Sequence, residues 1–259
     1  MDLLWMCCAA CLASLLTFFS GFGLGTLLLP VLSLFYGPAS GVVLTAFVHF
    51  LNGLYKAVLL RKHMQTNVAL KFALFAIPSA IAGSWCLFYL SDFAEEPFFT
   101  ASIGRAQFFV DPLGVVIGAL MLCFGLMELL PTFQTLSFSP RLLWLGGLSS
   151  GFFGGLSGHQ GALRSAFLIR LQLTKEQYLA TGVLIAIFID LTRLPYYLFY
   201  NSDVPVSALE MGPVLLSALF GTWLGNRYLK KVSIRWVRNA VAAFLLLSGL
   251  AFLTGFHFA

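Results

Sequence analysis

Residues 151–165 of this apolar chain bring glycines together with side chains that could bind an anion. The stretch reads GFFGGLSGHQGALRS and contains five glycines. A glycine weakens a helix by about 1 kcal/mol relative to alanine, so this density predicts an interrupted helix. A half-helix that starts after such a break presents free backbone N–H groups and a positive dipole end, which attract anions. We therefore expect a substrate site that includes Gly158, His159, Gln160, Gly161, Arg164 and Ser165.

A second glycine-rich break, GFGLG at Gly21–Gly25, lies near the start of the chain. Thr26 would open the half-helix that follows, so Gly23, Gly25 and Thr26 are further candidates for the substrate site. Inside a membrane, broken backbone is tolerated only where protein or water satisfies its polar groups. The alternative for residues 151–165 is that the glycines only let helices pack closely. Burying a histidine and an arginine for packing alone would be costly, which favours the ligand site.

Three polar residues inside another apolar segment, His49, Asn52 and Lys56, share one helical face because they recur at i, i+3 and i+7. Intramembrane charge is a functional hypothesis by default, and we interpret this face as a polar stripe along a substrate path. His49 and Asn52 therefore join the candidate substrate site. The alternative is that Lys56 extends its amine to the membrane interface and that Asn52 bridges two helices.

Asp190 and Arg193 lie three residues apart on one predicted helix, with Tyr197 one turn further along. Such a pair can be purely structural, because each ion compensates the other. The other interpretation is that Asp190 accepts and releases a proton while Arg193 contacts a substrate anion. Arg193 thus completes the candidate substrate site. Asp190 and His49 are the candidates for proton coupling, since histidine titrates near neutral pH.

Composition identifies the setting of these residues. Of the 259 residues, 59% are hydrophobic and 10% are charged, whereas globular proteins carry roughly 25% charged residues. No soluble fold of this length could bury so much apolar surface, so we predict an all-α polytopic protein of the cell (inner) membrane. The net charge of +5 is small, and basic residues beside membranes mark cytoplasmic loops rather than nucleic-acid contacts. The five cysteines form no metal-binding pattern, and no cofactor is expected.

Weak internal repetition suggests one integral membrane domain made of two repeats, residues 1–135 and 136–259. The two glycine-rich breaks lie roughly 136 residues apart, so that Gly25 falls on Gly161. The apolar segments that must position the polar residues are about 3–20, 26–36, 38–60, 68–90, 109–130, 141–157, 162–173, 177–200, 208–226 and 236–256.

Loop charges bear on the topology. With eight ordinary crossing helices, Arg61 and Lys62 would face the opposite side from the basic cluster Arg227–Arg238, against the positive-inside rule. If each broken pair is a re-entrant hairpin, each half has one hairpin plus three transmembrane helices, and the halves are inverted. The basic loops then share one side, which we take as the cytoplasm. Eight plain transmembrane helices in a parallel 4+4 repeat are the alternative.

Taken together, these features resemble the TauE/SafE sulfite exporter family, also called the 4-toluene sulfonate uptake permease family. The residues that carry the resemblance are GFGLGTLLLPVL at Gly21–Leu32, Thr45 with Asn52, the loop Arg61-Lys62-His63, and Gly151–Ala166. The resemblance implies a permease that moves small sulfur-containing or organic anions, often outward, with proton coupling proposed. The chain departs from the family pattern in three places, which are GFGLG in place of a poly-Gly run, Arg164 after Gly158-His-Gln-Gly161, and Ala166 where a proline is usual.

The sequence therefore predicts a secondary transporter, proton-coupled, for a small anion such as sulfite, a sulfonate, or another organosulfur or carboxylate compound. Its expected partners are this anion and the lipid bilayer, with no nucleic acid. A passive anion channel is one alternative. An intramembrane enzyme using His159 with Asp190 is another, although the sequence has no HExxH, GxSxG or paired-Asp signature.

Overall fold

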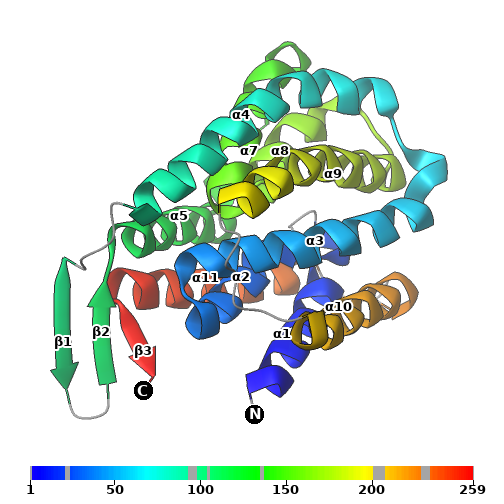
Figure 1. Ribbon diagram of the computed structural model, residues 1–259. Coiled ribbons are helices and arrows are strands. Elements are labelled where there is room, and N and C mark those ends of the chain that lie inside the picture. Colours follow the sequence, from blue (N-terminus) through cyan, green and yellow to red (C-terminus); the bar gives the residue numbers. More distant parts are fainter. Residues whose placement is uncertain are drawn as a thin grey trace.

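A computed structural model describes residues 2–20, 24–92, 98–103, 106–134, 137–200, 208–228 and 234–258. The described chain is almost entirely helical (Figure 1). Its first part contains α1 (Asp2–Ser20), α2 (Leu24–Tyr36), α3 (Pro38–Leu60), the 3-10 turn η1 (Arg61–His63), α4 (Thr66–Asp92), α5 (Pro112–Leu129) and α6 (Pro131–Gln134). Its second part contains η2 (Pro140–Leu142), α7 (Leu143–Ser157), α8 (Gly161–Leu168), η3 (Ile169–Leu171), α9 (Lys175–Tyr200), α10 (Ala208–Tyr228) and α11 (Ile234–Thr254).

Several of these helices can cross a membrane. A spanning helix needs about 20 predominantly apolar residues, because the hydrocarbon core is about 30 Å thick. Five helices in the described part of the chain are long and apolar enough, and they are Pro38–His63, Thr66–Asp92, Pro112–Leu129, Lys175–Tyr200 and Trp236–Thr254. The helical, polytopic membrane architecture predicted from composition is therefore confirmed.

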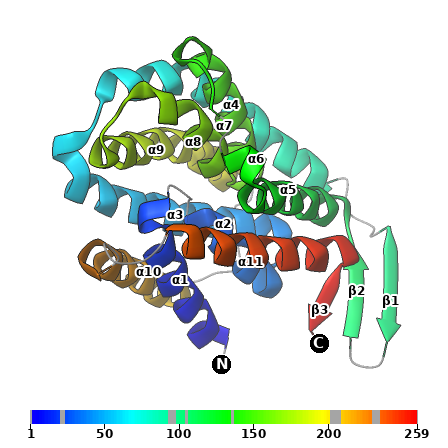
Figure 2. The same ribbon diagram turned by 180° about the vertical axis from the view of Figure 1, so that it is seen from behind.

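Helices that are distant in the sequence pair along their lengths. α4 packs against α7, and α1 packs against α10. α5 lies beside α11, and α3 lies beside α9 near the middle of the bundle (Figures 1 and 2). His49 of α3 and Asp190 of α9 therefore meet inside the protein instead of facing lipid.

Three glycines of α7, Gly147, Gly151 and Gly155, bring its backbone close to α4. A Cβ atom at Gly151 would lie 2.8 Å from Ala76 Cα, so no larger residue fits without a shift. Their i, i+4 spacing places them on one face, as in the small-residue interfaces of membrane helices. Close packing, the alternative interpretation, therefore accounts for these glycines, while the break begins only at Gly158.

The break itself lies where the glycine-rich stretch predicts it. α7 ends at Ser157 and α8 begins at Gly161, so that three residues separate the two helices. Gly158 has a φ of 78°, a left-handed conformation that glycine adopts without steric cost. Arg164 consequently lies in the first turn of α8.

The other predicted break falls largely on residues 21–23, which lie outside the described residues. Because α2 begins at Leu24, Gly25 and Thr26 lie within its first turn, and the half-helix starts two residues earlier than predicted. Gly23, also predicted as a ligand, lies outside the described residues. Part of the basic cluster 227–238 likewise lies outside them, at residues 229–233.

A small antiparallel sheet, which was not predicted, lies at one end of the otherwise helical bundle (Figure 1). β1 (Phe99–Ile103) pairs with β2 (Ala106–Val110), and β2 pairs with β3 (Phe256–Phe258). The aromatic and β-branched residues of these segments favour strands. The third strand comes from the far end of the chain, a pairing that no local pattern indicates.

Candidate functional site

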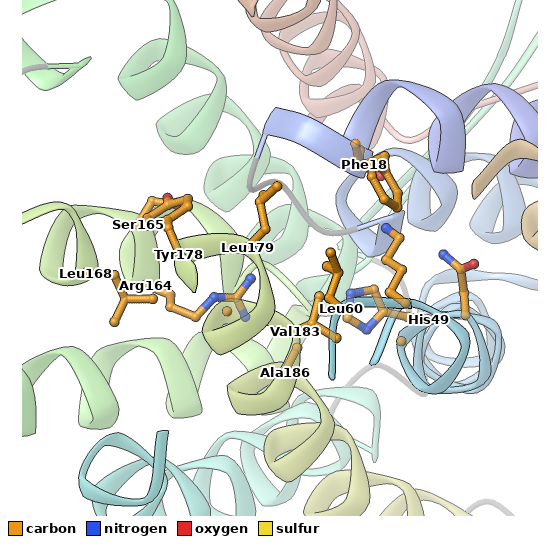
Figure 3. A pocket seen from close by; sticks show the side chains of 15 residues that line it. Phe18, His49, Leu60, Arg164, Ser165, Leu168, Tyr178, Leu179, Val183 and Ala186 are labelled. Atoms are coloured by element: carbon orange, nitrogen blue, oxygen red, sulfur yellow. The ribbon is translucent and has the colours of Figure 1, made fainter. Parts of the chain in front are cut away.

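A small cavity lies among α1, α3, α8 and α9, and several predicted site residues line it (Figure 3). Its volume is about 50 Å³. A single water needs roughly 10–15 Å³, so the cavity would hold a few waters or one small ion. Arg164 reaches in from α8, and His49 faces it from α3 (Figure 3). Asn52 and Lys56, on the same face of α3, also line the cavity.

Two basic side chains of the cavity are buried without a carboxylate partner. Lys56 is 9% exposed and Arg164 is 6% exposed. Within the described ranges, no carboxylate oxygen lies within 4.0 Å of either cation. Lys56 Nζ instead lies 5.7 Å from the centroid of the Phe18 ring, a cation–π contact. Because buried cations that no carboxylate contacts directly are costly, the cavity is suited to an anion.

Arg164 is positioned by the helix break. Its backbone N–H donates to the Gln160 carbonyl at 3.2 Å, which starts the first turn of α8. Its guanidinium packs against Gly182 of α9, where a Cβ atom would lie 3.4 Å from Arg164 Nε. Arg164 Nη1 donates to Gln160 Oε1 at 3.3 Å. A guanidinium has five N–H donors, so this one bond leaves capacity for a bidentate contact to an oxyanion.

Behind the cavity wall, Asp190 holds three polar partners in a buried network. His49 Nδ1 donates to Asp190 Oδ2 at 2.6 Å. Arg193 Nε donates to Asp190 Oδ1 at 2.9 Å, and Arg193 Nη2 lies 2.8 Å from the same oxygen. Gln160 Nε2 donates to Asp190 Oδ1 at 3.3 Å. His49 therefore contacts both the cavity and the carboxylate.

The first turn of α2 meets the break between α7 and α8 beside this network. A Cβ atom at Gly25 would lie 3.6 Å from the Gly158 carbonyl oxygen and 3.8 Å from His49 Cδ2. Two buried polar atoms in this region, Thr45 Oγ1 and His159 Nε2, have no hydrogen-bond partner among the described residues. The glycine-rich segments of the two parts of the chain are thus brought into contact, next to His49 and Asp190.

The family model named Sulfite exporter TauE/SafE matches residues 6–252 of the chain. The protein belongs to the TauE/SafE sulfite exporter family. No curated protein and no solved structure matches it. TauE/SafE proteins are membrane transporters, so this protein is an integral, multi-pass membrane transporter and not an enzyme. The alternative of an intramembrane enzyme is thereby excluded.

The residues predicted for the substrate site and for proton coupling fall into three groups in the structure. Those that line the cavity are His49, Asn52, Arg164 and Ser165. Those that lie in the Asp190 network or beside the breaks are Gly25, Thr26, Gly158, His159, Gln160, Gly161, Asp190 and Arg193. Gly23 lies outside the described residues.

Two of the predicted ligands have other partners. Arg193 does not line the cavity, because Nη1 donates to the Gly154 carbonyl at 2.6 Å and the rest of the guanidinium contacts Asp190. Asn52 lines the cavity, but its Oδ1 accepts a hydrogen bond from the Thr222 hydroxyl of α10 at 2.7 Å. This contact gives Asn52 the helix-bridging role that was the alternative interpretation.

Some residues that line the cavity were not among the predicted ligands. Lys56 is one, although its charge and its place on the face of His49 were available signals. Phe18 and Tyr178 also line the cavity, and Gly182 makes room for Arg164. Aromatic residues and single glycines are common in apolar helices, so their spacing alone gave no signal.

Proposed function

We propose that this TauE/SafE protein is a proton-coupled secondary transporter of a small anion such as sulfite, a sulfonate or a small carboxylate. The observation that carries the proposal is the pair of buried cations, Lys56 and Arg164, that share a cavity and lack a carboxylate partner within the described residues. Ionisable groups buried in membrane proteins face protein or water and are retained for function, because burying them is costly.

The chemistry of the cavity favours a small oxyanion. Arginine can bind two oxygens of one sulfite, sulfonate or carboxylate group at once, and the lysine adds a point charge. A volume of about 50 Å³ leaves no room for a large organic group in this conformation. Proton coupling is assigned to His49 and Asp190, because the imidazole lines the cavity and donates to the buried carboxylate.

For the architecture, we propose two inverted repeats, each with a re-entrant hairpin and three crossing helices. Eight residues of α8 rise about 12 Å and thirteen residues of α2 about 20 Å, both short of the roughly 30 Å hydrocarbon core. The packing is also reciprocal, since α7 pairs with α4 and α1 pairs with α10. A shift by the spacing of the two breaks places α1 on α7 and α4 on α10. The pair α1–α10 is therefore the counterpart of the pair α7–α4, which supports a repeat.

The proposed cytoplasmic side is the end that carries η1 and η3. Leu60 and Leu168, which precede these basic turns, line the cavity, so the cavity lies toward this end. The positive-inside rule favours the cytoplasm for Arg61, Lys62 and Arg170. The substrate would then enter from the cytoplasm across the cell (inner) membrane.

Flux through proteoliposomes tests the function. We expect the wild-type protein to move sulfite, and a pH gradient to change the rate. Replacing Arg164 by alanine removes a charge-assisted contact of about 1.5–3 kcal/mol, which should raise the half-saturating sulfite concentration roughly 10- to 100-fold. Arg170→Ala is the matched control, because this exposed arginine of η3 contacts the Ser137 hydroxyl instead of the cavity.

Three outcomes would contradict the proposal. Equal flux in wild type and Arg164→Ala would remove the arginine from the substrate site. Wild-type flux at channel rates, without any response to a pH gradient, would favour the passive channel. The absence of flux for every anion in a panel of sulfite, thiosulfate, sulfonates and carboxylates would refute anion transport itself.

A further inference from the structure

We propose that Gln160 is a positioning residue that links anion binding at Arg164 to protonation of the His49–Asp190 pair, so that an anion and a proton favour each other's binding. This inference rests on the proposed function, since it assumes that the cavity binds an anion. It assigns Gln160 a role other than direct contact with the substrate. It also fixes the sign of the coupling, which the proposed function leaves open.

The side chain of Gln160 spans the two functional groups. Its Oε1 accepts from Arg164 Nη1 at 3.3 Å, and its Nε2 donates to Asp190 Oδ1 at 3.3 Å. Among the described residues, this amide is the only hydrogen-bonded connection between Arg164 and Asp190. The charges determine its orientation, because the reverse would set the NH₂ group against a guanidinium and the oxygen against a carboxylate.

The surroundings hold this amide in place. Gln160 is fully buried, and its carbonyl accepts from the Ser150 hydroxyl at 2.9 Å while its backbone N–H donates to the Gly158 carbonyl at 2.9 Å. A Cβ atom at Gly154 would lie 3.3 Å from Gln160 Cβ, so the wall behind the side chain is close. A change at Arg164 is therefore passed on to Asp190 rather than absorbed by rotation of the glutamine.

The sign of the coupling follows from electrostatics. With the cavity empty, the positive Arg164 polarises the amide and helps to keep Asp190 ionised. An anion bound to Arg164 neutralises that charge and competes with Gln160 for the Nη1 donor. The carboxylate then loses stabilisation, so the His49–Asp190 pair binds a proton more readily. By reciprocity, a proton on the pair favours anion binding at Arg164.

The other charged or titratable groups near Asp190 do not offer the same link. Besides His49 and Arg164, the two ends of the link, they are Arg193 and Tyr197 from α9, Lys56 from α3, and His159 between α7 and α8. Lys56 lines the cavity, but within the described ranges no carboxylate oxygen lies within 4.0 Å of it, and the His159 ring contacts the Ser157 hydroxyl. Arg193 is held by Asp190 and the Gly154 carbonyl, and the Tyr197 hydroxyl donates to the Gly155 carbonyl, so neither touches the cavity. α7 carries no charged residue, and those of α4, which packs against α9, are exposed.

The experiment measures the dissociation constant of sulfite for purified protein in detergent as a function of pH. Sulfite titrates near neutral pH itself, but this contribution is the same for every variant and cancels in the comparison. Full coupling adds a loss of affinity of about tenfold per pH unit as the pair deprotonates. Gln160→Leu keeps the bulk and removes both hydrogen bonds, so this extra pH dependence should disappear while sulfite still binds.

A control and a second variant separate linkage from a structural role. Gln65→Leu is the control, since the hydrogen bonds of Gln65 use its backbone, and it should keep the wild-type pH dependence. Gln160→Glu should bind sulfite weakly at high pH, where its carboxylate pairs with Arg164. It should recover toward wild type at low pH, where the protonated side chain can again donate and accept.

Transport gives an independent readout in proteoliposomes. Gln160→Leu should move sulfite down its own gradient, but a pH gradient should no longer stimulate the flux. Retention of the wild-type pH dependence and stimulation by Gln160→Leu would overturn the inference. A wild-type affinity for sulfite that rises with pH, once the protonation of sulfite itself is taken into account, would also overturn it. So would a Gln160→Glu variant whose affinity for sulfite does not recover at low pH. A wild-type protein that binds and transports none of the anions would overturn the proposed function, and this inference with it.

Discussion

Replacing Asp190 by asparagine should destabilise the protein strongly, although the two side chains have nearly the same volume. Asp190 is fully buried, and its carboxylate compensates the buried Arg193 and accepts from His49 and Gln160. Removing one partner of a buried ion pair leaves the other charge unpaired and costs about 3–5 kcal/mol. We expect a loss of this size in the free energy of unfolding.

Denaturant titration of the protein in detergent micelles measures this loss, with Asp111→Asn as the control. Asp111 is half-buried and caps α5 by accepting from the Gly114 backbone at 2.7 Å. Asparagine caps a helix about as well as aspartate, so the control should change stability by less than about 0.5 kcal/mol. Adding Arg193→Gln to Asp190→Asn should recover part of the loss, because residues in one network couple by about 0.5–3 kcal/mol. A loss for Asp190→Asn no larger than that of the control would refute the reasoning about the buried charge.

Two further predictions concern packing. Gly151→Ala should separate α7 from α4 and destabilise the protein by about 1–3 kcal/mol, the usual cost of overpacking. Gly212→Ala is the control, because a Cβ atom there meets nothing within 4 Å, and it should be neutral or stabilising. The same denaturant titration compares the two variants, and equal effects on the free energy of unfolding would contradict the predicted contact. Thr222→Val removes the hydroxyl that donates to the buried Asn52, and the unsatisfied amide oxygen should lower the free energy of unfolding by about 1–3 kcal/mol. An unchanged midpoint of unfolding would show that the packing of α3 against α10 does not depend on this hydrogen bond.

The sequence predicted which polar residues are buried in the helices more reliably than it predicted which partners they contact. The i, i+3 spacing of Asp190 and Arg193 predicted a pair, and the structure contains it. That His49 is the third member depends on how α3 packs against α9, across 141 residues of sequence. Helical periodicity shows which residues share a face but not which helix that face meets. The same limit explains why Arg193 was predicted as a ligand although Gly154 and Asp190 occupy its donors.

The glycines show why residue type alone does not assign a role. Gly151 and Gly158 belong to one glycine-rich stretch, yet one packs against α4 and the other takes a left-handed turn at the end of α7. The break could be predicted because several glycines jointly weaken a helix. Which glycines serve the break and which serve packing depends on the neighbouring backbone. The sheet was missed for a related reason, because β3 pairs with a strand from a distant part of the chain.

The charges around the site connect the proposed substrate with the proposed coupling. Among the described residues, Lys56, Arg164 and Arg193 are buried near the carboxylate of Asp190, and the other buried carboxylate, Glu128, pairs with Arg238. Three positive charges therefore accompany the one negative charge of Asp190 when His49 is neutral. A proton added to this cluster alone would increase its net positive charge, which is unfavourable in a medium of low dielectric constant. A proton that arrives with an anion adds no net charge if the anion is monovalent, and a divalent anion lowers the charge further. The excess of buried cations thus favours an anion as the transported species and explains why its binding and protonation should occur together.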